Sequence, residues 1–208
     1  MKVIGVTGPS GSGKSKVSSI LRENGYPVVD ADEVGHIIRP RFVEDIKKLF
    51  GDTYVEDGVV NAKKLALLVF NDRVELNKLN ELMFPAIIEE MKRRVEVYRT
   101  QGAEFVFCDS AVLFTSHADK FMDYIILVTA SRITRLERLI KFRKVDPMVA
   151  MSQVDSVFIT HDEIEHCDLI LVNENNDELE LKLKIFEWLH SLKEGKANVG
   201  ENRESSTD

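Results

Sequence analysis

A phosphate-binding loop of the form G-x-x-x-x-G-K-[ST] constrains the fold of this chain more than any other feature. It spans Gly8 to Ser15, between a short β-branched run (Lys2–Thr7) and a run with helical spacing (Lys16–Leu21). A strand, a glycine-rich turn and a helix in this order are the context that makes the motif a physical site. Its glycines let backbone N–H groups surround a polyphosphate, and the helix N-terminus adds its positive dipole end. The sequence therefore predicts a nucleotide-binding α/β fold.

We expect this loop to bind ATP and Mg²⁺. Lys14 would reach the β- and γ-phosphates, and the Ser15 hydroxyl would be a Mg²⁺ ligand. The other nucleotide contacts expected from the loop are at Gly8, Ser10, Gly11, Ser12, Gly13 and Lys16.

Length and charge limit the classes of function. The 208 residues suffice for one α/β domain with insertions, and a net charge of −7 argues against general binding of nucleic acid or membrane surfaces. Cys108 and Cys167 lack metal-ligand spacing, so we interpret them as reduced thiols of a cytoplasmic protein. No apolar run is long enough to span a bilayer. We expect small-molecule substrates and no nucleic-acid or membrane partner, and the oligomeric state is left open.

Continuous apolar runs predict a core of about five parallel strands flanked by helices. The runs are Lys2–Thr7, Pro27–Asp30, Glu104–Cys108, Tyr124–Thr129 and Leu169–Val172. The chain between the second and third runs is nearly all helical. We expect Asn61 to cap one of its helices and Pro85 to open another.

The helical block interrupts the alternation of strands and helices, which indicates an insertion. We expect a kinase-type core at residues 1–38 and 100–194, a helical substrate-binding insertion at about 39–99 and a small lid at about 138–162. Insertions at the carboxyl ends of strands usually shape pockets, although extra structural helices are the alternative. Residues 195–208 are polar and without periodicity, so we expect a disordered tail.

Two aspartates stand at the carboxyl end of the second predicted strand, and phosphoryl transfer needs a group that orients or deprotonates the attacking hydroxyl. Asp30 or Asp32 could orient or deprotonate an attacking hydroxyl, while the other caps the next helix; their spacing does not choose between them. Asp109 follows the third strand, where a carboxylate can hold Mg²⁺ through water. An aspartate that merely starts a turn is the alternative for Asp109.

A basic stretch from Ser131 to Lys144 contrasts with the acidic chain, and we expect it to form a helix that Ser131 caps and that runs to about Lys144. It carries Arg132, Arg135, Arg138, Lys141, Arg143 and Lys144 against one acid, Glu137. Such a stretch suits a lid that neutralises phosphate charge, and a solvated helix face is the alternative. Arg138 and Arg143, near the following loop, are the better candidates for ATP contacts.

Several stretches, in order, match patterns of one known family. The patterns are V-[IV]-D-A-D followed by Arg or His, an F-G…D-G block ending in V-F, L-N…H-P, D-x-P-L-L-F-E and A-D-x-V-I-x-N. The matching stretches are Val28–His36, Phe50–Gly51, Glu56–Asn61, Leu65–Phe70, Leu79–Asn80, Phe84–Pro85, Asp109–Phe114 and Asp168–Asn173. Over about residues 2–192, the chain thus resembles the dephospho-coenzyme A kinases.

The resemblance implies an enzyme that transfers the γ-phosphate of ATP to the ribose 3′-hydroxyl of dephospho-coenzyme A, the last step of coenzyme A synthesis. It implies Asp32 as the catalytic base and residues 11–16 as the ATP loop. His36 would lie by the acceptor, with Phe84 and Asp109 also at the substrate. Arg138 and Arg143 would be lid residues that face phosphates.

Three departures from the family pattern stand out. Phe84 replaces a histidine before Pro85. Ala111 and Thr115 replace a proline and a glutamate. The segment 154–167 lacks the usual arginines and has His161 and His166, which we interpret as surface or capping residues of a short helix. A related nucleoside or nucleotide kinase with another acceptor, and a nucleotide-binding protein with reduced catalysis, are the alternative functions.

Overall fold

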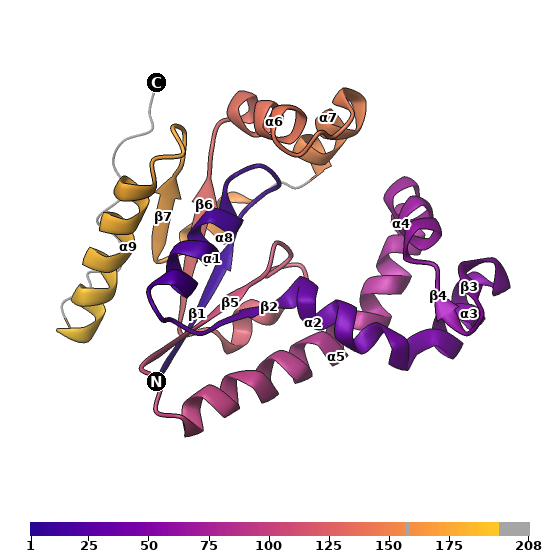
Figure 1. The fold of residues 1–208 in the computed structure, drawn as a ribbon, viewed down its shortest axis with the longest axis horizontal. Helices are drawn as coiled ribbons and strands as arrows, with labels where there is room; N and C mark the ends of the chain where they lie inside the picture. The colour runs from indigo at the N-terminus through magenta and orange to yellow at the C-terminus, as the bar shows by residue number, and fades with distance from the viewer. Residues whose placement is uncertain (157–158, 196–208) are drawn as a thin grey trace. The chain divides into compact units, whose positions relative to one another are not determined.

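The chain forms two compact units, which Figure 1 traces from the N-terminus onward. A computed structural model describes residues 1–156 and 159–195. The first unit contains residues 1–28 and the chain from residue 102 onward, and the second contains residues 29–101. The predicted disordered tail lies outside the described residues from position 196 on.

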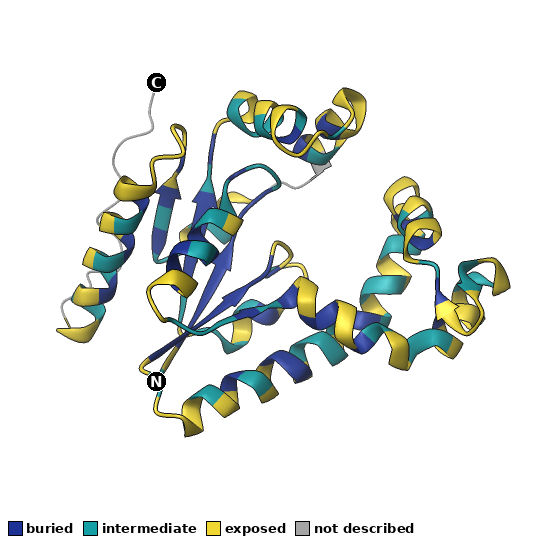
Figure 2. Ribbon diagram, in the orientation of Figure 1, coloured by how far each residue is buried: buried dark blue, intermediate teal, exposed yellow. Residues whose placement is uncertain are grey.

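A five-stranded sheet organises the first unit, as the apolar runs predicted. Its order is β2-β5-β1-β6-β7, and the strands are β1 (Lys2–Thr7), β2 (Val28–Asp30), β5 (Phe105–Asp109), β6 (Tyr124–Thr129) and β7 (Leu169–Val172). β1 pairs in parallel with β5 and β6, and β6 pairs in parallel with β7. β1, β5 and β6 are coloured as buried over most of their length in Figure 2. This burial explains why their sequences are continuous apolar runs.

Two helices pack against the sheet and form its main core. They are α1 (Lys14–Glu23), which follows the phosphate-binding loop, and α9 (Glu178–Lys193) near the C-terminus. Each helix presents one apolar face, and the buried residues of these faces are Val17, Ile20, Leu21, Leu181, Ile185 and Leu189. They contact strand residues of β1, β5, β6 and β7 in one cluster. This core fixes the start of α1, and with it the position of the loop.

Three helices lie between β6 and β7: α6 (Arg132–Lys141), α7 (Pro147–Ser156) and α8 (His161–Glu165). The predicted cap at Ser131 is confirmed, since its hydroxyl accepts a hydrogen bond from the backbone N–H of Thr134 at 3.2 Å. α6 ends at Lys141, three residues before the predicted end at Lys144. A small apolar cluster of Leu139, Ala150 and Val154 joins α6 to α7.

The second unit is mostly helical. Its helices are α2 (Ala31–Ile38), α3 (Val43–Phe50), α4 (Ala62–Asn71) and α5 (Arg73–Thr100). A short antiparallel hairpin of β3 (Val55–Glu56) and β4 (Val59–Val60), which the sequence did not predict, lies between α3 and α4. The predicted cap at Asn61 is confirmed by its hydrogen bond from the Lys64 backbone N–H, at 3.0 Å.

The boundary between the units differs from the one expected at about residue 39. The second unit begins at Val29, so the end of β2 and the whole of α2 belong with the helical residues. The reason is packing, because α2 lies along α5. A Cβ added at Gly35 on α2 would stand 3.5 Å from Ile87 of α5, which is ordinary contact distance. Asp30, which ends β2, and Asp32 are therefore both part of the helical unit.

The prediction that Pro85 opens a new helix is wrong. Pro85 lies inside α5, which runs unbroken from Arg73 to Thr100. An interior proline removes one helical hydrogen bond and costs about 3 kcal/mol. Contacts with α2 and α4, and buried residues on both sides such as Met83 and Met91, outweigh that cost.

Across residues 1–156 and 159–195, every helix is too short or too polar to cross a lipid bilayer.

Candidate active site

Gly11 and Gly13 stand at positions of the turn before α1 that only glycine can occupy. Gly11 and Gly13 have φ of +81° and +98°. A Cβ at Gly11 would stand 2.6 Å from the carbonyl oxygen of Arg135, and one at Gly13 would stand 2.1 Å from Nδ2 of Asn173. Both the backbone conformation and the lack of space exclude other residues. The loop is thus held tightly between α6 and the end of β7.

The start of α1 suits an anion. Among the described residues no side chain caps this helix, and its first turn carries no acidic residue. The free N–H groups and the positive end of the helix dipole therefore stay available to a phosphate. A hydrogen bond from the Ser12 N–H to the Pro9 carbonyl, at 3.1 Å, closes the preceding turn.

Lys14 and Asp109 form an ion pair at the base of the loop. The Lys14 ammonium contacts Oδ1 of Asp109, and the Ser18 hydroxyl donates to Oδ2 at 2.5 Å. The Lys14 and Asp109 side chains are only 15% and 5% exposed. Because a buried carboxylate needs such partners, Asp109 holds Lys14 beside the loop when no phosphate is bound. Ser18 is a part of this arrangement that the sequence reasoning missed.

Ser15 is exposed at the start of α1, and its hydroxyl contacts Arg143. Arg143 Nη2 lies 3.5 Å from Ser15 Oγ, a long and weak contact. Lys16 instead pairs with Glu178 of α9, which lowers the pKa of that carboxyl, first through the hydrogen bond from Lys16. Arg143 is thus the predicted lid arginine that contacts the proposed Mg²⁺ ligand Ser15.

Arg138 occupies a different place from the one expected of a phosphate ligand. Its Nη1 donates to the carbonyl oxygens of Gly11 and Ser12 at 3.3 and 3.1 Å, and its Nη2 donates to those of Asn173 and Glu174 at 2.7 and 3.0 Å. Burial lowers the pKa of this guanidinium, an effect that Glu174 opposes. In this state Arg138 joins the loop to the end of β7.

Asn173 also joins the phosphate-binding loop to the end of β7, and the sequence did not predict it as a site residue. It is 2% exposed, and its Nδ2 donates to the Ser12 carbonyl at 2.9 Å. Ser12 and Asn173 are 161 positions apart in the sequence. No local pattern could have indicated the contact, although Asn173 closes one of the stretches that match the family.

Two members of the basic stretch serve the local structure of the helices instead. Arg132 makes a two-pronged ion pair with Asp155 of α7, at 2.8 and 2.7 Å, and Lys141 pairs with Glu137 at 3.0 Å. For these residues the solvated-face alternative is the better description. His161 begins α8 and His166 is its C-cap, and both are exposed. His166 Nδ1 lies 2.6 Å from the Asp162 carbonyl oxygen, as expected for surface and capping residues.

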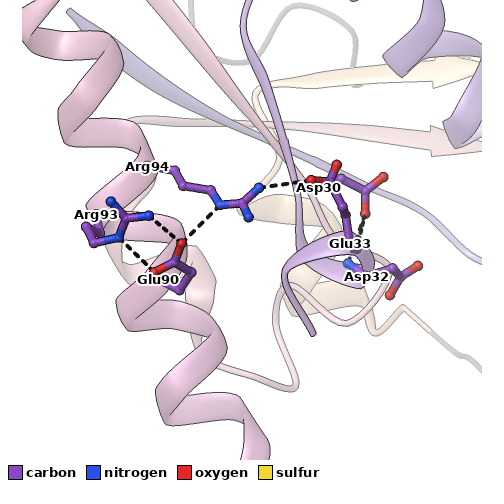
Figure 3. Close-up of polar contacts among 6 residues, drawn as sticks. All are labelled: Asp30, Asp32, Glu33, Glu90, Arg93 and Arg94. Carbon is purple, nitrogen blue, oxygen red and sulfur yellow. Dashed lines mark hydrogen bonds and ion pairs between the residues drawn. The ribbon is translucent and has the colours of Figure 1, made fainter. Parts of the chain in front are cut away.

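In the second unit, the structure separates the roles of the two aspartates. Asp30 caps α2, since its Oδ1 accepts from the backbone N–H groups of Asp32 and Glu33 at 2.9 and 3.1 Å. Asp32 is exposed, and within residues 29–101 its carboxylate has no hydrogen-bond or ion-pair partner. Figure 3 shows Asp32 at the first turn of α2, with Asp30 and Glu33 beside it. Of the two aspartates, Asp32 is therefore the one whose carboxylate does not cap the helix.

A pocket of about 400 Å³ opens beside Asp32 within this unit. The structure brings Asp32, His36 and Phe84, three of the predicted substrate residues, to its lining. Arg39 and Asn80 are its other polar members, and apolar residues form the rest, including Ile46, Leu65, Val69, Met83 and Ile87. Asp109, the fourth predicted substrate residue, lies in the first unit on Lys14.

Comparison with known proteins gives a consistent result. The model of the dephospho-CoA kinase family matches residues 2–178. A dephospho-CoA kinase from Listeria monocytogenes is 33% identical over 183 residues, which are 86% of this chain and 90% of the relative. Among these comparisons, nothing favours the alternative of another nucleoside or nucleotide acceptor.

Solved structures resemble the fold over nearly its whole length. TT1252 from Thermus thermophilus is 26% identical with a TM-score of 0.76, covering 92% of this chain and 97% of its own. A dephospho-CoA kinase from Campylobacter jejuni is 19% identical with a TM-score of 0.66, covering 93% of this chain and 98% of its own. At that identity, the second likeness supports the fold alone.

Proposed function

The chain belongs to the dephospho-CoA kinase family and catalyses the ATP-dependent phosphorylation of dephospho-coenzyme A, and we propose that Asp32 and Lys14 carry this transfer. In this proposal Asp32 orients and deprotonates the acceptor's ribose 3′-hydroxyl. Lys14 and the loop N–H groups hold the β- and γ-phosphates of ATP. Phosphoryl transfer gains most from positioning and charge stabilisation, which these groups supply.

The observation that carries the proposal is that the two aspartates have different structural roles. Asp30 is occupied as the cap of α2, while Asp32 keeps its carboxylate free within its unit and lines the pocket. A general base must reach the proton that it removes, and a carboxylate at the edge of a substrate pocket meets that requirement. A structural aspartate would have been expected to show a partner.

The ion pair between Lys14 and Asp109 supports the role of Lys14. With no nucleotide bound, Asp109 keeps the ammonium beside the loop and in a defined position. When ATP binds, a phosphate offers Lys14 a second anionic partner. We propose that Lys14 then contacts the β- and γ-oxygens, with Arg143 adding positive charge near Ser15.

We propose Mg²⁺ as the cofactor of ATP, with Ser15 and Asp109 as the residues that hold it. Hydroxyl and carboxylate oxygens are the hard ligands that Mg²⁺ prefers, usually few in number because phosphates and waters complete its shell. The described residues accordingly hold no cluster of three or more His, Cys, Asp or Glu side chains suited to a metal. When bound, Mg²⁺ neutralises charge on the β- and γ-phosphate oxygens.

The pocket suits an acceptor with both apolar and charged parts. Its apolar wall would contact the uncharged portions of dephospho-coenzyme A, and Arg39 provides a fixed positive charge for the diphosphate. His36 would lie at the acceptor as well. Phe84 contributes ring surface where the family pattern has a histidine, so the pocket of this chain is more apolar at that position.

We also propose a cytoplasmic location. Cys108 and Cys167 are free thiols, and burial raises the pKa of each to about 12, so neither ionises near neutral pH. Unreactive free thiols are typical of proteins from reducing compartments.

Asp32→Asn, with Asp30→Asn as the matched control, tests the central assignment. Asparagine is as good a helix cap as aspartate, so the control keeps the cap and loses a charge only two residues away. We expect Asp32→Asn to lower kcat by about 10²–10⁴-fold while the Kd for ATP stays within twofold, as for the loss of a general base. Asp30→Asn should retain kcat within a few-fold. Equal kcat for the two variants would contradict the role of Asp32.

A further inference from the structure

A cluster of charged residues on α5 connects that helix to the first turn of α2 (Figure 3). Glu90 accepts two hydrogen bonds from Arg93, from Nε at 2.8 Å and from Nη2 at 2.7 Å. It accepts a third from Arg94 Nε at 3.2 Å. Arg94 then extends further, and its Nη1 donates to Oε1 of Glu33 at 3.1 Å. Glu33 stands next to Asp32 in the sequence.

The two arginines of the cluster differ in their surroundings. Glu90 is 8% exposed, so its charge needs the partners that it has. The side chain of Arg94 is 24% exposed and that of Arg93 is 65% exposed. Among the described residues, Arg93 bonds only to Glu90, on its own helix. Arg94 joins two helices, because its Nε donates to Glu90 of α5 and its Nη1 donates to Glu33 of α2.

The position of Glu33 gives this contact its significance. The backbone N–H groups of Asp32 and Glu33 both donate to Oδ1 of Asp30, so the three residues form one hydrogen-bonded turn. A contact that restrains the Glu33 side chain therefore also restrains the backbone of this turn. The cap fixes the turn along the helix axis, and Arg94 holds it against α5. Together the two interactions restrain the backbone that carries Asp32.

Apolar packing holds one side of that turn, where Ala31 and Val34 are buried, but it does not hold the two acidic residues. The close approach of α2 and α5 occurs one turn later, where Gly35 faces Ile87. At the first turn itself, Asp32 and Glu33 are exposed and contribute no apolar packing. The hydrogen bond from Arg94 therefore restrains the exposed side of this turn, which the buried residues do not hold.

We propose that Arg94 is a positioning residue for phosphoryl transfer, which holds the first turn of α2 through Glu33 and thereby aims the Asp32 carboxylate at the acceptor hydroxyl. The inference rests on the proposed role of Asp32. Glu90 orients Arg94 for this task by accepting from its Nε. Arg93 neutralises Glu90 and has no part in the positioning.

Arg94→Ala and Arg93→Ala are the matched pair that tests it. Each removes one arginine from the same acid on the same helix face, and only the first removes the contact with Glu33. A displacement of about 1 Å in a reacting group can lower a rate by 10²-fold. We expect Arg94→Ala to lower kcat by about 10- to 100-fold, with the Kd for ATP within twofold of wild type. Arg93→Ala should keep kcat within threefold.

A double variant separates positioning from mere stability. If Arg94 acts through Asp32, Arg94→Ala should add less than a twofold loss in an Asp32→Asn background, because no base remains to be aimed. Single-turnover formation of coenzyme A, followed by product mass, reads the slow variants. The same 10- to 100-fold loss in both backgrounds would overturn the inference.

Two milder variants keep the test decisive if Arg94→Ala does not fold. Glu33→Gln keeps the shape of the side chain and weakens the contact, so its kcat should fall by about 3- to 10-fold. Arg94→Lys keeps the charge but loses the fork that reaches both acids, and it should fall between wild type and alanine. Wild-type kcat in both variants would overturn the inference.

The results also distinguish this inference from the proposed function. Full activity of Asp32→Asn would mean that Asp32 is not the base, and both ideas would fail together. A loss in Asp32→Asn, with Arg94→Ala as active as Arg93→Ala, would leave the proposed function intact and remove the positioning role alone.

Discussion

Replacement of Gly13 by alanine tests whether the loop is held by the geometry described above, and Gly25 offers a matched control. Both glycines have left-handed backbones, with φ of +98° and +83°. A Cβ at Gly25 would have nothing within 4 Å, whereas one at Gly13 would stand 2.1 Å from Nδ2 of Asn173. The control therefore reports the backbone cost alone.

The magnitudes follow from these contacts. A non-glycine residue in the left-handed region costs about 1–2 kcal/mol, which is the whole effect expected for Gly25→Ala. Gly13→Ala must also displace the buried Asn173 amide and break its hydrogen bond to the Ser12 carbonyl. An unmade buried hydrogen bond costs about 1–3 kcal/mol. We thus expect a total loss of about 2–5 kcal/mol for Gly13→Ala.

Urea unfolding of the two variants measures the difference, provided that the m-values agree. Asn173→Ala should relieve the clash, so the two substitutions at Gly13 and Asn173 should be coupled by about 1 kcal/mol or more. Equal free energies of unfolding for Gly13→Ala and Gly25→Ala would refute the claim that Asn173 closes the loop.

Three further predictions concern charge and the pocket. Lys14→Ala should weaken ATP binding at least tenfold by calorimetry and should destabilise the fold by roughly 3 kcal/mol, because Asp109 stays buried without its cation; unchanged ATP affinity would exclude Lys14 from the site. Hydrogen bonds from Arg93, and less from Arg94, lower the pKa of Glu90 from 4.5 to about 2 despite its burial. The stability that Glu90 contributes is therefore present above about pH 4.5 and is lost as the pH falls toward 2. The difference in free energy of unfolding between wild type and Glu90→Gln should shrink over that range, and a constant difference would contradict the ion pair. Phe84→His should lower the KM for dephospho-coenzyme A by about 2- to 10-fold through one added hydrogen bond, and an unchanged KM would mean that the pocket is built around the Phe84 ring.

Local chemistry made much of the fold predictable. The strands are buried apolar runs, and the caps at Asn61 and Ser131 act within three residues of their own position. Pro85 shows where local reasoning fails, because the signal for a helix start is overruled by packing along α5. The β3–β4 hairpin has strands of only two residues, too short to show any alternation in the sequence.

The site, too, has residues that local sequence patterns predict and residues that only the assembled fold identifies. The loop motif identifies itself, and the spacing of Asp30 and Asp32 left two candidates that only the cap geometry separates. Arg138 is the instructive case, since its sequence position suggested a phosphate ligand. Its four carbonyl partners come from the loop and from the end of β7, more than 30 residues away in either direction. Such contacts depend on the assembled sheet and have no signature in the sequence.

The most direct test of the account is the formation of coenzyme A from Mg·ATP and dephospho-coenzyme A, followed by product mass. Adenosine, AMP and acceptor-free reactions serve as controls. The account predicts turnover only when dephospho-coenzyme A is the acceptor, even though the segment 154–167 contains no arginine. ATP binding without any transfer to dephospho-coenzyme A would contradict it and would favour a nucleotide-binding protein that has lost catalysis.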